Sequence, residues 1–374
     1  MAERRIAVFT GSRSEYGLLS HLIAAIAAEP EMALQLIVSG SHLSEHHGST
    51  LAEIEAEGYR PAALVPLSLN ESPQRSMVAL AAEALAGVGK ALEILKPDLL
   101  ILLGDRYETF AAASAAHLNT IPIVHLHGGE TTKGAVDDRL RHAISQLSTW
   151  HFTAAEPYRE RVIAMGHPPE LVFNVGPMVL DNLMNEKPAS RSEFEKRTGY
   201  RFGHKNLLVT YHPETLLPDH GVAGFEALLQ ALEGLTCHVL FTHPNADAGN
   251  DQLLALLKRF VYHHPESSWA VPSLGQKLYL TALRLFDAMA GNSSSGLIEA
   301  PFLGIPVINI GDRQAGRLRH VCVRDVASQK HAIAVGLEQQ LEARRSVCRA
   351  TNALMPCETP TKAILSWLRE GPGV

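Results

Sequence analysis

The chain is short of cysteine, of excess basic charge and of long apolar runs, and each shortage excludes a class of protein. Its four cysteines lack the C-x-x-C spacing of a zinc knuckle and do not suggest a disulfide framework; they are Cys237, Cys322, Cys348 and Cys357. A net charge of −6 provides no positive field for nucleic acid or an anionic membrane. The apolar run 99–103 is far too short to span a membrane, and the run 6–9 is too short for the core of a signal peptide. We therefore expect a cytoplasmic protein that binds neither nucleic acid nor membrane.

The pattern along the first half of the chain predicts alternating strands and helices. With 374 residues, 46% of them hydrophobic, the chain is long enough for two globular domains. Short apolar runs bounded by glycine, proline or polar residues predict strands at 6–9, 34–38, 99–103, 121–126 and 150–153. Helical periodicity predicts helices at 18–28, 79–95, 108–118 and 139–147. This alternation is typical of a parallel sheet covered by helices.

A second alternating series follows. Strands are predicted at 207–211, 238–242, 285–290 and 307–310, and helices at 225–232, 253–260, 278–283, 296–302 and 361–368. The polar segment 185–201 is expected to form a linker helix. We predict an α/β protein of two Rossmann-like domains, 1–180 and 181–358, with segment 359–374 returning as a helix to the first domain. Ligands of such sheets bind beyond the carboxyl ends of the strands, so polar residues there are the candidates.

Segment 291–299, Gly-Asn-Ser-Ser-Ser-Gly-Leu-Ile-Glu, gives the strongest single signal for a ligand site. A predicted strand runs into glycine and serines and then into a helix, whose amino end would bind an anion through Ser293 and Ser294. Glu299, one turn into that helix, could accept hydrogen bonds from ribose hydroxyls. Leu297 stands where a P-loop has lysine, so that motif is excluded. An ordinary serine helix cap is the alternative.

Two further segments supply candidate acid–base groups. Asp105 and Arg106 follow the strand 99–103 and could act as a base and a phosphate ligand. The segment 125–130, His-Leu-His-Gly-Gly-Glu, follows the next strand; alternation along it would place His125 and His127 on one face, with Glu130 close behind. A solvated, charged surface is the alternative for both segments.

Asp137, at the start of the next predicted helix, is a further candidate acid–base residue. Three polar residues that follow it share one face of that helix. Helical spacing places Asp138 beside Arg141 and His142. Several titratable groups after neighbouring strands form a plausible acid–base cluster.

The remaining candidates also follow predicted strands. Arg13 lies in a strand-to-helix turn that does not have the G-x-G-x-x-G pattern, so a nicotinamide cofactor is not indicated. His212 and Asn245 each lie next to a proline at a strand end, where turn geometry alone is the alternative explanation. Arg313 follows the strand 307–310. The 19 histidines include no H-E-x-x-H pattern, so no metal is expected either.

In their order and spacing these segments resemble the hydrolysing UDP-N-acetylglucosamine 2-epimerases of sialic acid and related nonulosonic acid biosynthesis. The resemblance extends from the segment 11–17 to the segment 311–314. It implies a GT-B fold with the active site in a central cleft between two Rossmann-like domains, and a homodimer or homotetramer. It also implies a UDP-sugar substrate and no metal or other cofactor.

The activity implied by this resemblance is conversion of UDP-N-acetylglucosamine to UDP and N-acetylmannosamine. The C2 proton is removed, UDP is eliminated anti, and water adds to the resulting glycal. By position, Asp105 and Asp137 match the family's catalytic carboxylates. His127 replaces a glutamate found in many members, which leaves open whether His127 or Glu130 performs its role. The positions that match UDP contacts are Arg13, Arg106, His212, Asn245, Ser293, Ser294, Glu299 and Arg313.

Other functions stay open at this level. One subfamily acts on UDP-N,N′-diacetylbacillosamine in legionaminic acid biosynthesis, and no residue of this sequence identifies which sugar is bound. A GT-B glycosyltransferase would share the nucleotide site but need an acceptor. A catalytically silent sugar-nucleotide sensor would bind without turnover.

Overall fold

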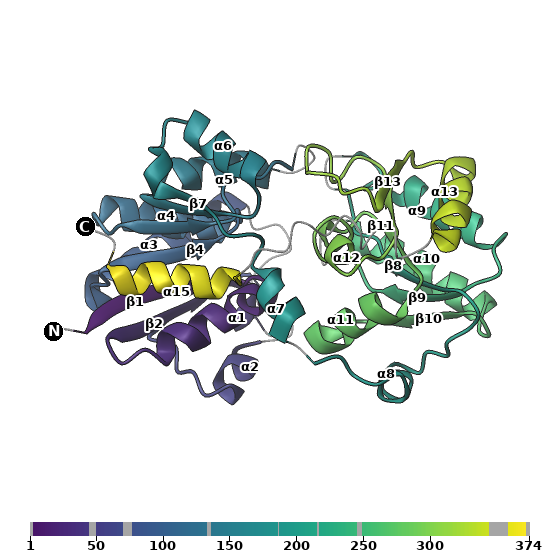
Figure 1. The fold of residues 1–374 in the computed structure, drawn as a ribbon, viewed down its shortest axis with the longest axis horizontal. Coiled ribbons are helices and arrows are strands. Elements are labelled where there is room, and N and C mark those ends of the chain that lie inside the picture. The colour runs from purple at the N-terminus through teal and green to yellow at the C-terminus, as the bar shows by residue number, and fades with distance from the viewer. Residues whose placement is uncertain are drawn as a thin grey trace. The chain divides into compact units, whose positions relative to one another are not determined.

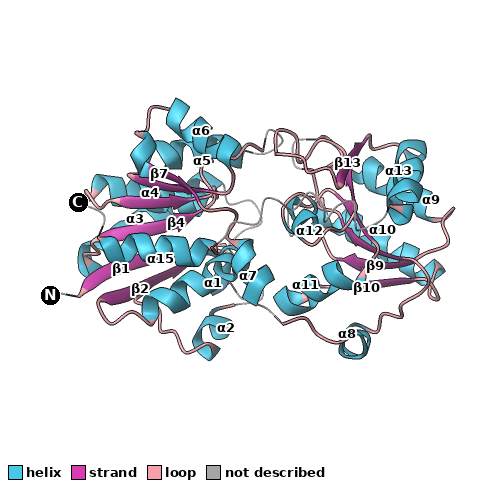
Figure 2. Cartoon of the chain, viewed as in Figure 1, coloured by secondary structure: helices cyan, strands magenta, loops and turns pink. Residues whose placement is uncertain are grey.

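The structure, a computed structural model, describes residues 3–44, 50–69, 77–132, 136–185, 187–214, 217–244, 249–343 and 358–371. The chain divides into two compact units. The first consists of Met1–Glu130, Val136–Met184 and Pro356–Val374, and the second of Thr131–Ala135 and Asn185–Met355. In each unit a sheet is covered by helices (Figure 2).

The first unit contains a seven-stranded parallel sheet of order β3-β2-β1-β4-β5-β6-β7. Its strands are β1 (Arg4–Thr10), β2 (Met32–Ser39), β3 (Ala63–Val65), β4 (Leu99–Leu103), β5 (Ile123–Leu126), β6 (Trp150–Thr153) and β7 (Val172–Asn174). Its helices are α1 (Arg13–Ala27), α2 (Leu51–Ala56), α3 (Met77–Leu95), α4 (Tyr107–Leu118), α5 (Asp137–Leu147), α6 (Glu156–Ala164) and α15 (Pro360–Glu370). Helix α7 (Val179–Asn185) ends this part of the chain.

The second unit contains a six-stranded parallel sheet of order β10-β9-β8-β11-β12-β13 (Figure 1). Its strands are β8 (Asn206–Thr210), β9 (His238–Thr242), β10 (Ser268–Val271), β11 (Ala288–Gly291), β12 (Val307–Ile310) and β13 (Val323–Val326). Its helices are α8 (Arg191–Thr198), α9 (Val222–Leu232), α10 (Asn250–His263), α11 (Gly275–Leu285), α12 (Glu299–Phe302) and α13 (Lys330–Glu342), with a short 3-10 helix, η4 (Ser294–Gly296).

These topologies confirm the predicted fold class of two Rossmann-like α/β units. In each sheet the strand order reverses once, between β1 and β4 in the first unit and between β8 and β11 in the second. Loops at such a reversal leave on opposite faces of the sheet, which opens a crevice at the carboxyl ends of the strands. The candidate ligand positions of each unit are therefore the residues that follow these four strands.

Central strands are apolar throughout because both faces of a parallel sheet are covered. All five residues of β4 are buried. They alternate between two apolar clusters, with Leu99, Ile101 and Leu103 in one and Leu100 and Leu102 in the other.

Helix α15 belongs to the first unit although it lies at the far end of the sequence. It runs alongside α1 and buries Ile364 and Leu368 in the same cluster as β1 (Figure 1). Trp367 packs edge-on against Trp150 and Phe152, with ring centroids 5.2 Å apart in both pairs.

Several predicted elements differ from the structure in their bounds, and three differences have a local cause. The single helix expected at 185–201 is instead the end of α7 and a separate α8, which Ser190 caps by accepting a hydrogen bond from the Glu193 amide. The strand expected at 285–290 begins only at Ala288, because Leu285 is still helical. The helix expected at 296–302 is divided into η4 and α12. Pro301 cannot donate the amide hydrogen bond that a continuous helix needs.

Within the described residues, no helix is both long enough and apolar enough to cross a membrane.

We predict that α15 contributes substantially to the stability of the first unit. Ile364 is fully buried, so Ile364→Ala should lower the free energy of unfolding by about 2–5 kcal/mol. Urea denaturation followed by tryptophan fluorescence measures this, since Trp150 and Trp367 lie in that unit. Ser366→Ala, at an exposed position of the same helix, is the control and should change stability by less than about 0.5 kcal/mol. Equal stability of the two variants would contradict this packing role.

Candidate active site

In the first unit, the residues after β1 and β4 bring together two buried carboxylates. Glu15 is 6% exposed and Glu108 is 1% exposed. Glu15 accepts a 2.7 Å hydrogen bond from the Gly11 amide, and Arg106 binds both carboxylate oxygens of Glu108 at 3.1 and 3.2 Å. Burial raises the pKa of Glu15 to about 7; the Arg106 charge opposes the rise and the neighbouring Glu108 adds to it. Sequence analysis missed both glutamates, although each lies in the first turn of a helix that follows a central strand.

Both arginines predicted in this unit have acidic partners. The Arg106 side chain is 45% exposed while it holds Glu108. Arg13, the first residue of α1, lies 3.2 Å from the Glu53 carboxylate, and both side chains are about half exposed. An anionic ligand would therefore have to share these guanidinium groups with the carboxylates or displace them.

Asp105 lies beyond β4 and is held by a buried arginine. Its carboxylate pairs with the guanidinium of Arg141, and Asp138 lies 3.8 Å from the same guanidinium. The Arg141 side chain is 3% exposed, whereas that of Asp105 is 21% exposed. Burial alone would lower the pKa of Arg141, but the charges of Asp105, Glu130 and Asp138 raise it above its ordinary value. Arg141 is thus the positive centre of three carboxylates, two of which, Asp105 and Asp138, reach solvent.

Asp137 is the first residue of α5 and belongs to the same electrostatic cluster. Burial and then the charge of Asp105 raise its pKa from 3.8 to about 6, while Arg106 and Arg141 act in the opposite direction. A carboxyl group that titrates near neutral pH can both accept and donate a proton. Asp137 is therefore a candidate acid–base group close enough to Asp105 to feel its charge.

His127 does not continue β5, so strand alternation does not place it on a face with His125. Its φ of +64° is left-handed, and its amide bonds the Phe152 carbonyl at 2.9 Å. The Met178 amide donates to Nε2 of His127 at 3.0 Å, and Nδ1 lies 3.1 Å from the Glu130 carboxylate. Because an amide can only donate, Nε2 is an acceptor and the proton of the neutral ring lies on Nδ1, facing Glu130.

His125 supports the loop that carries Asp105. It is fully buried, and its Nε2 lies 2.8 Å from the Gly104 carbonyl while its Nδ1 lies 3.0 Å from the Ser145 hydroxyl. Since a carbonyl can only accept, Nε2 carries the proton of the neutral ring. Burial lowers the pKa of His125 to about 4, which favours this neutral form.

In the second unit, the serine segment follows β11 as expected. Gly291 has φ +134°, and a Cβ there would lie 1.9 Å from the Thr210 carbonyl oxygen, so only glycine allows this approach of β11 to β8. The Ser293 hydroxyl accepts from the Ser295 amide at 3.4 Å and caps η4. Glu299 begins α12 rather than lying one turn into a helix. The continuous helix expected over 296–302 is therefore absent from this described segment. The hydroxyl and amide groups of a tight turn are the hydrogen-bonding groups there instead.

The other predicted residues of this unit surround Asn292. His212, after β8, exchanges two main-chain hydrogen bonds with the Asn292 side chain, and Arg313, after β12, donates to the Asn292 carbonyl at 3.1 Å. Burial and the nearby Arg313 charge lower the pKa of His212 to about 3, so its ring is neutral. Asn245 lies outside the described residues. Sequence analysis quoted Asn292 within a motif but did not propose a role for it.

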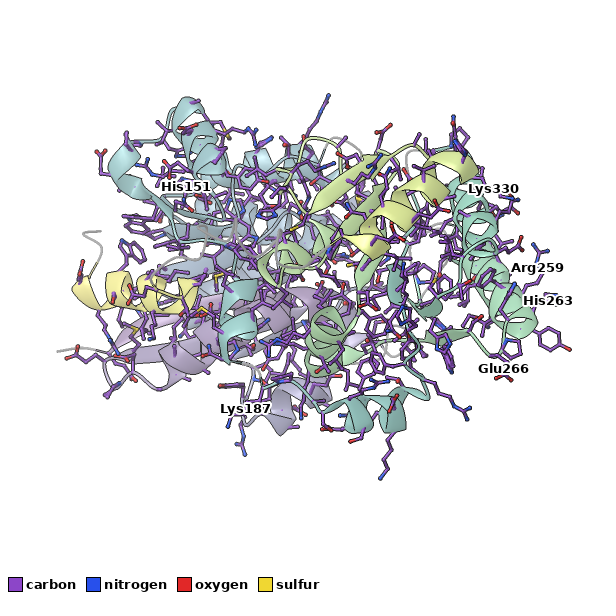
Figure 3. The ribbon with its side chains drawn as sticks, turned by 45° about the vertical axis from the view of Figure 1, so that its right-hand side comes forward. His151, Lys187, Arg259, His263, Glu266 and Lys330 are labelled. Carbon is purple, nitrogen blue, oxygen red and sulfur yellow. The ribbon has the colours of Figure 1, made fainter. Side chains whose placement is uncertain are left out.

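The surroundings of the described histidines do not suggest a metal site. His42 contacts the Thr10 and Thr50 hydroxyls at 3.0 and 2.6 Å. His263 projects from the edge of the second unit beside Arg259, whereas His151 lies in the interior of the first (Figure 3). In the part of the chain that the structure describes, no three histidine, cysteine or acidic side chains are grouped so that they could hold a metal ion.

The raised pKa of Asp137 predicts a specific effect on stability. Its folded-state pKa, about 6, exceeds the ordinary 3.8, so ionisation of Asp137 destabilises the fold as pH rises from about 4 to 6. Asp137→Asn should remove this penalty and raise the free energy of unfolding by about 1–3 kcal/mol at pH 7, with little gain at pH 4. Urea denaturation at both pH values measures it. Asp138→Asn, which removes a partner of Arg141, should give no such gain; an equal gain would refute the assignment to Asp137.

Comparison with known proteins shows the family of the chain. Residues 24–362 match the UDP-N-acetylglucosamine 2-epimerase family. The chain is 36% identical to the GDP/UDP-N,N′-diacetylbacillosamine 2-epimerase (hydrolyzing) of Campylobacter jejuni, over 85% of this chain and 83% of that protein. It is also 36% identical to the UDP-N,N′-diacetylbacillosamine 2-epimerase (hydrolyzing) of Legionella pneumophila, over 90% and 89%.

A solved structure shares the fold. The crystal structure of UDP-GlcNAc 2-epimerase from Neisseria meningitidis bound to UDP-GlcNAc superposes with a TM-score of 0.79 at 18% identity, covering 98% of this chain and all of that one. This likeness, together with the family match over most of the chain, supports the GT-B class predicted from the sequence. The chain belongs to the UDP-N-acetylglucosamine 2-epimerase family.

Proposed function

We propose that this protein is a hydrolysing 2-epimerase of a UDP-linked 2-acetamido sugar. The observation that carries the proposal is the pair Asp105 and Asp137 in the first unit. Both carboxyl groups belong to one cluster around the buried Arg141, and burial together with the charge of Asp105 raises the pKa of Asp137 to about 6. Epimerisation at carbon needs one proton removed and another returned, and two neighbouring carboxyl groups suit that task.

We assign the removal of the C2 proton to Asp137, because a carboxyl group with a pKa near 6 is suited to act as a base at neutral pH. The electron pair of the C2–H bond forms the C1–C2 double bond as the C1–O bond breaks, and UDP leaves with the electron pair of that C1–O bond. Water then attacks C1 and gives its proton to Asp105. Asp105 returns this proton to C2 on the opposite face, and Asp137 loses its proton to solvent. The net reaction is substrate plus water to UDP plus the free epimerised sugar.

His127 and Glu130 support these groups in the proposal. Nε2 of His127 is engaged by the Met178 amide, so it can take up a substrate proton only by giving up that bond. Glu130 is 4% exposed and interacts electrostatically with Arg141. We therefore assign to His127 the orientation of Glu130, and to Glu130 part of the negative charge that keeps Arg141 in place beside Asp105.

The second unit supplies the nucleotide-binding groups in this proposal. Ser293 and Ser294 offer hydroxyl and amide groups to the diphosphate, Arg313 offers positive charge, and Glu299 offers acceptors to the ribose. His212, Asn245, Arg13 and Arg106 complete the set that the resemblance suggests. The family to which the chain belongs supports this division of roles.

Two candidate substrates are each favoured by a separate observation. Two relatives that share 36% identity with this chain are named for N,N′-diacetylbacillosamine, which favours UDP-N,N′-diacetylbacillosamine. The name of the family as a whole favours UDP-N-acetylglucosamine. We place UDP-N,N′-diacetylbacillosamine first, because the two relatives named for it are each 36% identical to this chain over at least 85% of its length.

The first test is incubation with each UDP-sugar separately, with UDP and sugar products followed by NMR in deuterated water. We expect UDP and a free 2-epimerised sugar that carries deuterium at C2, formed faster from UDP-N,N′-diacetylbacillosamine. Release of a UDP-linked epimer would show a non-hydrolysing enzyme. UDP binding without any product would contradict the proposal and favour a glycosyltransferase or a sensor.

A pair of aspartates at the two ends of β4 tests the catalytic assignment. Asp105→Asn should lower kcat by about 10²- to 10⁴-fold and leave the affinity for UDP within about threefold, because it removes a proton-transfer group. Asp98→Asn is the matched control, since Asp98 lies at the opposite end of β4 and binds Arg5 at the surface. It should keep the turnover of the unmodified protein. Near-normal turnover in Asp105→Asn would remove Asp105 from the mechanism.

A further inference from the structure

A fully buried asparagine joins the two central strands of the second sheet at their carboxyl ends. Asn292 follows Gly291 at the end of β11 and has no exposed surface. Its Oδ1 accepts a 2.7 Å hydrogen bond from the His212 amide, and its Nδ2 donates a 2.9 Å hydrogen bond to the His212 carbonyl. Main-chain hydrogen bonds between β8 and β11 stop where these strands end, at the reversal of strand order. The Asn292 side chain continues the connection between the two strands beyond that point.

The main chain of Asn292 reaches the next strand as well. Its carbonyl accepts from Nη1 of Arg313 at 3.1 Å and from Nε2 of Gln314 at 3.0 Å. Both donors follow β12, and Gln314 is 2% exposed. One residue therefore connects the loops that follow β8, β11 and β12, which are neighbours in the sheet.

The chemistry around this side chain favours an uncharged amide. Burial raises the pKa of the neighbouring Glu214, and hydrogen bonds from Tyr211 and Asn292 together with the Arg313 charge oppose that rise. Nδ2 of Asn292 thus faces a carboxylate and a carbonyl, both of which only accept hydrogen bonds. An aspartate at this position would turn an oxygen toward these acceptors and place a second negative charge beside Glu214.

We infer that Asn292 is the positioning residue of the nucleotide-binding half, which holds the His212 main chain and the Arg313 guanidinium in the arrangement that binds the diphosphate of UDP. The inference rests on the proposed function. Asn292 makes no contact with the nucleotide in this assignment. It acts because a diphosphate ligand requires donors fixed before binding, and the donors here follow separate strands whose ends Asn292 connects.

The chain contains a matched asparagine that we expect to act in folding alone. Asn206 begins β8, at the opposite edge of the same sheet, and is 6% exposed. Its Nδ2 donates to Asp287 at 3.1 Å and to the Gly203 carbonyl at 3.2 Å, and its Oδ1 accepts from the Tyr200 hydroxyl at 3.0 Å. Asn206 therefore connects the start of β8 to the residue before β11, just as Asn292 connects the carboxyl ends of the same two strands. The candidate ligand loops follow the carboxyl ends, so Asn206 lies a strand's length away from them.

The experiment compares the Kd of UDP by titration calorimetry for the full-length protein and for Asn292→Ala, Asn292→Asp and Asn206→Ala. Both alanine variants should lower Tm, because each removes buried hydrogen bonds. Asn292→Ala should weaken UDP binding by about ten- to a hundredfold, and Asn292→Asp by at least as much. Asn206→Ala should change the Kd by less than about twofold.

A double variant tests the route through Arg313. Arg313→Ala should weaken UDP binding by itself. Asn292→Ala should then reduce the affinity for UDP by a smaller factor in the Arg313→Ala background than in the unmodified protein, because the two residues share one interaction. Should Asn292→Ala fail to fold, Asn292→Ser takes its place in both comparisons.

Three results would overturn the inference. A folded Asn292→Ala that binds UDP as tightly as the unmodified protein would show a purely structural role, as would an equal loss of affinity in Asn206→Ala. Strict additivity with Arg313→Ala would exclude the route through Arg313. A different result, failure of the unmodified protein to bind UDP, would refute the proposed nucleotide site and therefore also the role of Asn292. It is distinguishable from the three results above, because in those the unmodified protein binds UDP.

Discussion

Parallel strands end at the same edge of their sheet, and the arrangement of this protein's polar residues depends on that constraint. Residues far apart in the sequence become neighbours because they follow strands that lie side by side. In the first unit this brings Glu15 and Glu108 together, from the helices after β1 and β4. In the second it brings His212 and Arg313 to Asn292. Helix–sheet packing fills the interior, so the polar groups that must be buried are concentrated at this edge.

Burial of several carboxylates in one unit requires compensating positive charge, and two arginines provide it. Arg106 holds Glu108, while Arg141 faces Asp105, Glu130 and Asp138. The compensation is incomplete, since the pKa values of Glu15 and Asp137 are raised to about 7 and about 6. Carboxyl groups with raised pKa values are common at catalytic sites, because a catalytic group must exchange its proton near neutral pH.

In the proposed function the second unit has a different task, which is to hold hydrogen-bond donors in place for the nucleotide. It uses neutral groups: a buried asparagine, a histidine whose pKa is lowered by burial, and a turn of serines. The tightness of that turn follows from Gly291, since any Cβ there would collide with the Thr210 carbonyl. A sheet that brings three loops together thus provides rigidity that no single loop has.

The sequence by itself determined the fold class, most central strands and the segments in which the polar groups lie. Strand β4 and strand β9 have the predicted bounds, because apolar runs bounded by glycine or proline leave little choice of structure. Predictions from strand alternation and helical periodicity were wrong where the strand or helix did not continue. The alternation expected for His125 and His127 broke down because β5 ends at Leu126 and the chain turns left-handed. Pro301 interrupted the helix expected to contain Glu299.

Only the tertiary structure decided the partners of each polar group. Nothing local indicates that Arg141 would face Asp105, 36 positions earlier, or that the Met178 amide would fix the tautomer of His127, 51 positions before it. Such pairs depend on strand order and on the packing of helices across a sheet, both of which are long-range properties. The sequence therefore identified which residue types were available, while the fold determined their distances, their burial and hence their proton affinities.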